Sequence, residues 1–402
     1  MREIKQAVIF CGGLGTRLGN ITKNLPKPMI KVGEKPFLEH LIIQLKKNGI
    51  KNLFLLVGYK HEKIKSYFGN GKDFNINIKY SYLPYKAKTG SRLFQIKDKL
   101  KEKFILLYCD NYSSLNIHKL NSEFTKQKKS ILVSLVKKRN GNCNYDKTNK
   151  KVIYKIKRSS KNDFVEIGYM IISKEILKNL KIKDKDFSKF LLKISRKKLI
   201  GGIVNKNGYA SIGDKNRLNL TRKLFANNNT LITDRDGVLN ISPKNRYLTD
   251  ARNLRINKIL CSKLPKYSNL ICITNQAALS TKDLTMKNLE KINFKIKDYL
   301  KKKKIFIKQF FVSHHHFKSN SFFRKPNPGL FYKASKKYKF ILDKTFYIGD
   351  DKRDIEAAYN ANTHIIYIGK KKLTLKEKLK YKFIILEKDI LKLYNEKIKN
   401  NF

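Results

Sequence analysis

Two aspartates, Asp234 and Asp236, stand one residue apart in the stretch "LITDRDGVLN", directly after an apolar run. Carboxylates this close repel each other unless a cation lies between them, so the pair indicates a Mg²⁺ site. One carboxylate can also attack an electrophile while its neighbour moves a proton. Because Asp and Gly are also common in ordinary turns, the pair alone is weak evidence for catalysis.

Three further groups of residues follow in order along the same half of the chain. "ITNQ" puts Thr274 at the end of an apolar run, and "RKPNP" supplies the cations Arg324 and Lys325. "YIGDDKRD" ends another apolar run on Asp350. Each group has an ordinary alternative: Thr274 can close a strand, Lys325 can be a surface cation, and Asp350 can cap a helix. Together and in this order, they favour a phosphoryl-transfer site.

A second set of reactive residue types lies near the start of the chain, in "AVIFCGGLGTRLGNITKNLPKP". Gly12, Gly13 and Gly15 allow backbone N–H groups to approach a phosphate closely, because no side chain is in the way. Arg17 and Lys27 add positive charge, and the prolines beside Lys27 fix its backbone. The spacing matches neither a dinucleotide-binding fingerprint nor a Walker loop, so the composite pattern predicts a different nucleotide loop.

The elements that must position these residues are strands that alternate with helices. Short apolar runs occupy residues 7–10, 53–57, 104–108, 131–136, 230–233, 270–274, 346–348 and 365–368. Between several of them lie helical patterns, such as 36–49, where five residues form one apolar stripe: Phe37, Leu38, Leu41, Ile42 and Leu45. The alternation predicts an α/β protein with sheets flanked by helices. In such sheets the chemistry collects at the carboxyl ends of the strands.

The length of 402 residues allows two domains of ordinary size. A polar stretch at 225–230 interrupts the pattern, so we expect domains at 1–224 and 228–402. The two halves carry different motifs and no internal repeat, which indicates a fusion rather than a duplication.

The composition excludes several classes of protein. Hydrophobic residues make up 41%, which excludes general disorder, and no apolar run approaches the ~18 residues of a membrane helix. The first residues lack the apolar core of a secretory signal, so we expect a cytoplasmic protein without a membrane partner. The five cysteines form no C-x-x-C pair, which argues against a disulfide framework and a cysteine-based zinc site.

The net charge of +59 comes from 90 Lys and Arg residues against 31 acidic ones. Lys, Asn, Ile and Phe are abundant throughout, and runs such as 301–304 are typical of solvated faces. No basic motif interleaved with aromatic residues stands out, so no specific nucleic-acid partner is predicted. Positive charge should still attract phosphorylated substrates.

Residues 228–370 resemble the haloacid dehalogenase superfamily. Within it, "DRDGVLN", "TNQ" and "RKPNPG" are most similar to the histidinol-phosphatase and heptose-bisphosphate-phosphatase branch. The resemblance implies that Asp234 is the nucleophile and forms an aspartyl-phosphate, while Asp236 protonates the leaving oxygen and then activates water. It implies phosphate-binding or substrate-binding roles for Thr274, Asn275, Arg324 and Lys325. It implies Mg²⁺ ligands at Asp234, Asp350 and the backbone carbonyl of Asp236.

The second half departs from this branch in one loop. Heptose phosphatases usually carry a zinc loop with cysteines before R-K-P, whereas this chain reads "SHHHFKSNSFFRKP". Without thiolate partners for His314–His316, zinc is not predicted. We expect packing to hold the loop, through Phe311, Phe317, Phe322 and Phe323. Ala278 also stands where the family commonly has Gly.

Residues 4–222 resemble the sugar-1-phosphate nucleotidyltransferases of the heptose- and mannose-1-phosphate guanylyltransferase type. The resemblance rests on GG-x-GTRL…PKP, "FLEHLI", "GYKHEKIKSYFG" and "TGSRLF". It implies a Rossmann-like mixed sheet and a triphosphate site at Gly12, Gly13, Gly15, Thr16 and Arg17. It implies that Lys27 stabilises charge at the α-phosphate, that Asp110 holds Mg²⁺, and that Thr89 and Gly90 line the nucleotide or sugar side.

Two positions depart from the nucleotidyltransferase pattern. Cys109 stands where the family usually has Gly before the metal aspartate. Ser211, in "YASIGDKN", stands where a second metal aspartate is expected, and Asp214 is a candidate replacement three residues on.

Together the two resemblances imply two doubly wound α/β domains in a bifunctional enzyme of activated-sugar synthesis. The second domain would remove the 7-phosphate of a heptose 1,7-bisphosphate, and the first would join the heptose 1-phosphate to a GTP-derived nucleotide. The expected partners are small sugar phosphates and a nucleoside triphosphate, with a homo-oligomer left open. Two alternatives remain: a phosphatase acting on another phosphate ester or a nucleic-acid 3′-phosphate, and a non-catalytic nucleotide- or sugar-sensing first domain.

Overall fold

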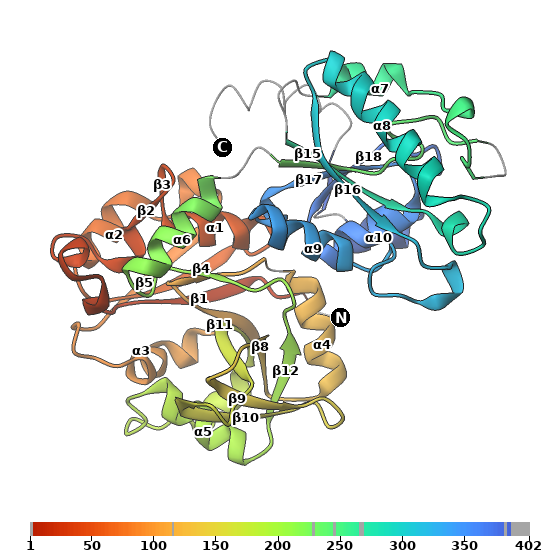
Figure 1. Cartoon of the computed structure of the whole chain (residues 1–402). Coiled ribbons are helices and arrows are strands. Elements are labelled where there is room, and N and C mark those ends of the chain that lie inside the picture. Colours follow the sequence, from red (N-terminus) through yellow and green to blue (C-terminus); the bar gives the residue numbers. More distant parts are fainter. Residues whose placement is uncertain are drawn as a thin grey trace. The chain divides into compact units, whose positions relative to one another are not determined.

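The computed structural model describes residues 3–114, 116–226, 230–243, 247–264, 269–381 and 384–386. The chain forms two compact units, Met1–Lys223 and Leu224–Phe402 (Figure 1). Each unit has its own sheet and its own hydrophobic core. No described helix is long and apolar enough to cross a membrane.

A nine-stranded mixed sheet forms the centre of the first unit. Strands β1, β4, β5 and β6 run parallel, whereas β11 pairs with β6 in the antiparallel sense. The mixed sheet predicted from the resemblance is therefore confirmed. Its strands are β1 (Gln6–Cys11), β4 (Asn52–Val57), β5 (Asn77–Tyr82), β6 (Lys103–Tyr108), β8 (Ile131–Lys137), β9 (Gly141–Asp146), β10 (Lys151–Ser159), β11 (Phe164–Ser173) and β12 (Ile200–Val204).

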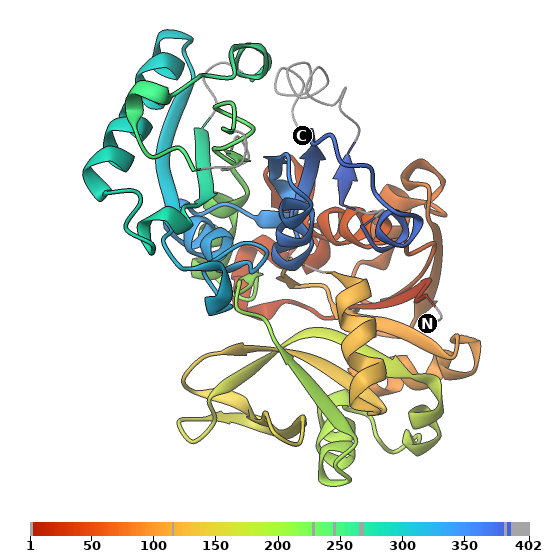
Figure 2. The ribbon, with the colours of Figure 1, turned by 90° about the vertical axis from the view of Figure 1, so that its right-hand side faces the viewer.

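The helices of the first unit are α1 (Phe37–Lys47), α2 (His61–Phe68), α3 (Thr89–Ile96), α4 (Ile117–Gln127), α5 (Phe187–Arg196) and α6 (Lys215–Ala226). The five residues of the predicted apolar stripe in α1 are fully buried, which confirms that helix. Residues of α3 and α5 share a hydrophobic core with residues of the sheet. Figure 1 and Figure 2 both show α4 alongside β12.

Two pairs of short strands complete this unit. One pair is β2 (Lys31–Val32) with β3 (Lys35–Pro36). The other joins β7 (Asn111–Tyr112) to β13 (Ala210–Ser211) and sets Asn111 opposite Ser211. This second pair brings the end of the domain next to the residues that follow β6.

The second unit contains a six-stranded sheet in the order β16-β15-β14-β17-β18-β19, and every pairing is parallel. Its strands are β14 (Thr230–Thr233), β15 (Asn269–Asn275), β16 (Phe306–Ser313), β17 (Phe346–Gly349), β18 (His364–Tyr367) and β19 (Ile385–Leu386). Its helices are α7 (Lys258–Lys263), α8 (Met286–Lys302), α9 (Gly329–Tyr338), α10 (Lys352–Ala361) and α11 (Leu375–Tyr381).

Both faces of this sheet are covered. Leu231 of β14 belongs to one core together with residues of α8, whereas the next residue, Ile232, belongs to a second core with residues of α9 and α10. Strands buried on both faces need apolar side chains at successive positions, which explains their uninterrupted apolar runs. The doubly wound arrangement predicted for this half is therefore confirmed.

Candidate active sites

The order of the strands brings two aspartates of the second unit together. From β14 the chain proceeds outward to β15 and β16, then crosses to β17 on the other side of β14. Adjacent parallel strands whose connections diverge leave a crevice at their carboxyl ends. Asp234 follows β14 and Asp350 follows β17, and the Asp234 N–H donates to the Ile348 carbonyl at 2.9 Å.

Gly237 lies directly against the Asp350 carboxylate. Its φ is +80°, and a Cβ on it would collide with the Asp350 carboxylate. The glycine of the "DRDGV" stretch therefore permits both a left-handed turn and the close approach of Asp350.

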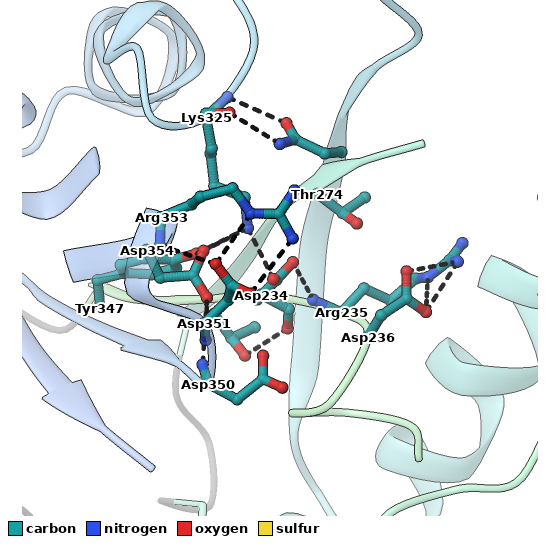
Figure 3. A network of polar contacts seen from close by, with 12 residues as sticks. Asp234, Arg235, Asp236, Thr274, Lys325, Tyr347, Asp350, Asp351, Arg353 and Asp354 are labelled. Atoms are coloured by element: carbon teal, nitrogen blue, oxygen red, sulfur yellow. Dashed lines mark hydrogen bonds and ion pairs between the residues drawn. The ribbon is translucent and has the colours of Figure 1, made fainter. Parts of the chain in front are cut away.

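Lys325 lies at the centre of the candidate site, with a side chain only 4% exposed. Its Nζ is 2.7 Å from Asp234 Oδ2 and 2.8 Å from Asp354 Oδ1, and it donates to the Tyr347 hydroxyl at 2.9 Å (Figure 3). Burial alone would lower the pKa of Lys325, but the two carboxylates raise it above its usual value. Lys325 is therefore a buried, charged ammonium shared by two aspartates.

The residues after β15 position this lysine. The Asn275 side chain donates to the Lys325 carbonyl and accepts from the Lys325 N–H, both at 3.0 Å. The predicted substrate-binding residue Asn275 thus fixes the backbone of Lys325. Thr274 is buried beside it, and its hydroxyl accepts a hydrogen bond from Gln276 at 2.9 Å.

Three carboxylates of this unit can surround a metal ion. Oxygens of Asp234, Asp350 and Asp354 all lie within 4.8 Å of one another, and no other such group occurs among the described residues. Burial raises the pKa of Asp234 to about 7 and that of Asp350 to about 6. A nearby cation would relieve that cost, and carboxylate oxygens suit Mg²⁺.

Asp354 is less available for a metal ion than the other two aspartates. One of its oxygens accepts from Tyr347 and lies against Lys325, while the other accepts from the N–H groups of Asp350 and Asp351 at 3.1 Å each. Asp351 is the N-cap residue of α10 and forms a capping box with Asp354. Asp234 and Asp350 are therefore the side chains best placed to hold Mg²⁺.

The Asp236 carboxylate lies apart from this cluster. Arg235, which is fully buried, binds both of its oxygens at 3.0 Å. Gln276 donates to it at 2.7 Å and Asn240 at 3.0 Å. Figure 3 shows the Asp236 side chain turned toward Arg235 rather than toward Asp350. Sequence patterns contain no sign of this network, because Arg235 and Gln276 lie on different strand ends.

Two arginines add positive charge near the cluster. Arg324, predicted to lie beside the substrate, is buried and donates to the His315 carbonyl at 2.9 Å. Arg353 was not predicted; it donates to Asp351 at 2.9 Å, and this bond raises the pKa of Arg353. The negative charge of Asp234 also contributes to this rise. Its place in the first turn of α10, after "GDDK", is the one sequence signal for this position.

The prediction that four phenylalanines hold the histidine loop is wrong for two of them. Phe311 is buried, but Phe317 is 60% exposed and Phe323 is 43% exposed. These two rings contact neighbours in the sequence instead: the ring centroids lie 4.1 Å apart for Phe317 and His316, and 5.5 Å apart for Phe323 and Phe322.

In the first unit, the glycine loop joins β1 to a 3₁₀ helix, Thr16–Thr22. Gly15 has a φ of +71°, while Gly13, Thr16 and Arg17 are exposed to solvent. Backbone N–H groups in such an open loop are accessible to a phosphate.

The buried arginine Arg92 packs against Gly12 of the glycine loop. Arg92, in "TGSRLF", donates to the carbonyls of Val57 at 2.5 Å, Leu83 at 2.9 Å and Pro84 at 2.8 Å. A Cβ on Gly12 would collide with its guanidinium. No motif assigned this role to Arg92, because its partners are carbonyls that any residue could supply.

Lys27 and Asp110 meet at the carboxyl end of β6. The Lys27 Nζ lies 2.6 Å from Asp110 Oδ2, and both side chains are largely buried. Lys27 begins a short 3₁₀ helix, Lys27–Met29, with Pro26 before it and Pro28 within it. The structure thus brings together the predicted phosphate-binding lysine and the predicted metal aspartate.

Thr89 and Gly90 begin α3 and pack within the first unit. The Thr89 hydroxyl accepts from the Phe187 N–H at 3.2 Å, and a Cβ on Gly90 would collide with the Asp184 carbonyl. These contacts hold α3 against the start of α5.

Comparisons with known proteins match a different family to each unit. The model of the nucleotidyl transferase family matches residues 6–144, and that of the haloacid dehalogenase-like hydrolases matches residues 301–368. A D-glycero-alpha-D-manno-heptose 1-phosphate guanylyltransferase of Campylobacter jejuni is 34% identical over 187 residues, 46% of this chain and 84% of that protein.

A protein of the same description from Aneurinibacillus thermoaerophilus is 33% identical over 131 residues. The match covers 32% of this chain and 56% of that protein, so the chain spans about half the length of this relative. The crystal structure of HddC from Yersinia pseudotuberculosis aligns with a TM-score of 0.48 and 22% identity, over 55% of this chain and 100% of that one. The chain belongs to the nucleotidyl transferase family through its first unit, and its second unit is a haloacid dehalogenase-like hydrolase domain.

Proposed function

We propose that the chain is a bifunctional enzyme of sugar-nucleotide synthesis. Its second unit would hydrolyse the 7-phosphate of D-glycero-D-manno-heptose 1,7-bisphosphate, and its first unit would transfer a guanylyl group to the heptose 1-phosphate so formed. The pairing has a chemical logic, because the product of one unit is the acceptor for the other. The observation that carries the hydrolase half is the buried Lys325 between Asp234 and Asp354, next to Asp350.

In the hydrolase reaction, Asp234 attacks the phosphorus and the ester bond to the sugar oxygen breaks, which leaves a phosphoryl group on the carboxylate. Asp236 donates a proton to the departing oxygen and then takes one from the water that hydrolyses the aspartyl-phosphate. For this role Asp236 must turn from its present partner Arg235 toward the substrate. Lys325 and Thr274 bind the phosphoryl oxygens.

Mg²⁺ held by Asp234 and Asp350 would offset the repulsion between an anionic nucleophile and an anionic substrate. Arg324 and Arg353 add positive charge on the substrate side of the cluster, where a sugar bisphosphate carries its second anionic group.

In the transferase reaction, an oxygen of the sugar phosphate attacks the α-phosphorus of the nucleotide, and pyrophosphate leaves with the bonding electrons. The glycine loop donates N–H groups to the phosphates and Arg17 supplies charge. Lys27 stabilises the negative charge that develops at the α-phosphate.

A product analysis tests both halves at once. The protein is incubated with heptose 1,7-bisphosphate, Mg²⁺ and a mixture of nucleoside triphosphates, and the products are identified by mass spectrometry. We expect heptose 1-phosphate, phosphate and GDP-heptose. Asp234→Asn should abolish phosphate release, whereas Asp298→Asn, a change in an exposed ion pair of α8, should not. Release that persists in Asp234→Asn would contradict the assigned nucleophile.

A second candidate concerns the first unit alone. The neutral Ser211 in place of an aspartate favours a module that binds a nucleotide without transferring it. Nucleotide binding with no release of pyrophosphate in the presence of heptose 1-phosphate would support this alternative.

A further inference from the structure

The cation nearest to the Asp110 carboxylate in this structure is the side chain of Lys27. The Nζ–Oδ2 distance is 2.6 Å, and the side chains are 11% and 24% exposed. An ammonium group this close neutralises the carboxylate and donates a charge-assisted hydrogen bond to it. The family resemblance implies that Asp110 binds Mg²⁺, but in this structure the Lys27 ammonium is the cation beside it.

The strand that lies against Asp110 contributes no second carboxylate. Ile212 donates its N–H to the Asp110 carbonyl at 2.9 Å, which places Ser211 next to the site. The Ser211 hydroxyl accepts from the Gly213 N–H at 3.2 Å, and its backbone exchanges two hydrogen bonds with Thr221. Ser211 is thus a neutral residue held in place by its own neighbours.

Two other acidic residues near this position are already engaged. Asp214 directly precedes α6, and its carboxylate accepts from the Arg217 N–H at 2.9 Å and pairs with the Arg217 guanidinium at 3.1 Å. Glu166 accepts a hydrogen bond from the Gly168 N–H, and burial raises its pKa to about 8. The candidate replacement suggested by the sequence, Asp214, is therefore occupied in capping a helix.

The residues around Asp110 consequently do not fit a preformed site for a divalent cation. Mg²⁺ prefers six oxygen ligands, and in phosphoryl-transfer enzymes it is often held by one or two carboxylates together with substrate phosphates. Here a single carboxylate is available, and it is already neutralised. Among the described residues, a group of three potential metal ligands occurs only in the other unit.

We propose that Lys27 serves as the resident cation of Asp110 in the free protein, and that the first unit binds a divalent cation only together with a nucleoside triphosphate. The phosphates would then draw Lys27 away from Asp110, so that the lysine reaches the α-phosphate at the moment the carboxylate receives the metal. This inference rests on the nucleotide binding of the proposed function and adds the order in which the charges exchange partners.

Mn²⁺ binding to the intact 402-residue chain, measured by electron paramagnetic resonance, tests the proposal. The background variant Asp234→Asn/Asp350→Asn removes two of the three carboxylates of the other unit. Without nucleotide we expect no bound Mn²⁺; with the α,β-methylene analogue of GTP we expect one bound Mn²⁺ per chain. Binding of the analogue itself is followed by equilibrium dialysis in the same samples.

The outcomes distinguish a failure of the inference about Lys27 from a failure of the proposed function of the first unit. Stoichiometric Mn²⁺ binding without nucleotide, at the affinity seen with it, would overturn the inference and leave the proposed function standing. No binding of the analogue under any condition would overturn both the inference and the transferase half of the proposed function.

Matched variants of Lys27 and Ser211 sharpen the test. Lys27→Met should strengthen nucleotide-free Mn²⁺ binding roughly tenfold relative to Lys27→Arg, because only the arginine still competes for Asp110. Ser211→Asp should also confer nucleotide-free binding, whereas Ser211→Asn should not. Circular dichroism confirms folding of each variant, and equal Mn²⁺ affinity in Lys27→Met and Lys27→Arg would overturn the proposal.

Discussion

Replacing Lys325 by Met should destabilise the second unit to an extent that depends on pH. The substitution keeps the length and the apolar stem of the side chain but removes the charge shared by Asp234 and Asp354. Removing one partner of a buried ion pair costs about 3–5 kcal/mol, because the remaining charge is left uncompensated. We expect a loss of this order at pH 8.

The sign of the pH dependence follows from Asp234. Burial raises its pKa to about 7 even in the presence of Lys325, above the ordinary aspartate value of 3.8. A carboxyl whose pKa is raised by folding binds its proton more tightly in the folded state, so stability falls as the pH rises toward the folded pKa. Without Lys325 that pKa rises further, and protonation at pH 5 relieves much of the penalty. The destabilisation should therefore be clearly smaller at pH 5 than at pH 8.

Hydrogen exchange read by mass spectrometry in increasing urea can measure this in the intact chain. Peptides that cover β14 and β17 report on the second unit, and peptides that cover β1 and β4 report on the first. Lys302→Met, which changes an exposed lysine of α8 with a side chain 74% exposed, is the control and should shift neither set. Equal destabilisation of Lys325→Met at pH 5 and pH 8, or none at pH 8, would refute the reasoning.

Three more predictions concern other contacts of the two sites. Gly237→Ala should abolish Mg²⁺-dependent phosphate release and lower stability by about 1–3 kcal/mol, because the new Cβ meets a carboxylate as well as an unfavourable φ. Gly33→Ala has a similar φ of +64° but open space, so phosphate assays should find it unaffected. Isotope-edited infrared spectroscopy can follow the protonation of the Asp234 carboxyl. We expect a pKa of about 7 without Mg²⁺ and a lower pKa with Mg²⁺. The same pKa under both conditions would argue against metal ligation by Asp234. Arg92→Lys should lower the stability of the first unit by about 2 kcal/mol and weaken nucleotide binding, because the carbonyls are bound by two guanidinium nitrogens and an ammonium has only one nitrogen. The exposed Arg139→Lys should do neither.

Much of the fold follows from the apolar runs. A strand covered on both faces carries apolar residues at consecutive positions, and this property makes "TLIT" and "LICIT" recognisable as strands from their residue types alone. The position of β11 is not predictable in the same way. It lies antiparallel between β6 and β8, and that pairing depends on contacts between residues far apart in the sequence.

The same distinction applies to the site. Asp234 and Asp350 could be expected to meet, because the carboxyl ends of parallel strands share one edge of the sheet. The orientation of Asp236 could not be inferred, because it depends on a buried Arg235 and on Gln276 beyond the next strand. Arg92 and Asn275 likewise act through backbone groups, which leave no signature in residue types.

The double pairing of Lys325 has a consequence for the proposed catalytic cycle. When Asp234 carries a phosphoryl group, its charge and shape change. If Asp234 were its one ion-pair partner, Lys325 would then no longer be held in position. Asp354 accepts hydrogen bonds from the Tyr347 hydroxyl and from the Asp351 N–H, which fix its carboxylate. Its ion pair with the Lys325 ammonium therefore persists through that change. Two different carboxylates thus have two different tasks: Asp234 is phosphorylated and regenerated in each cycle, whereas Asp354 keeps the same contact with Lys325 throughout.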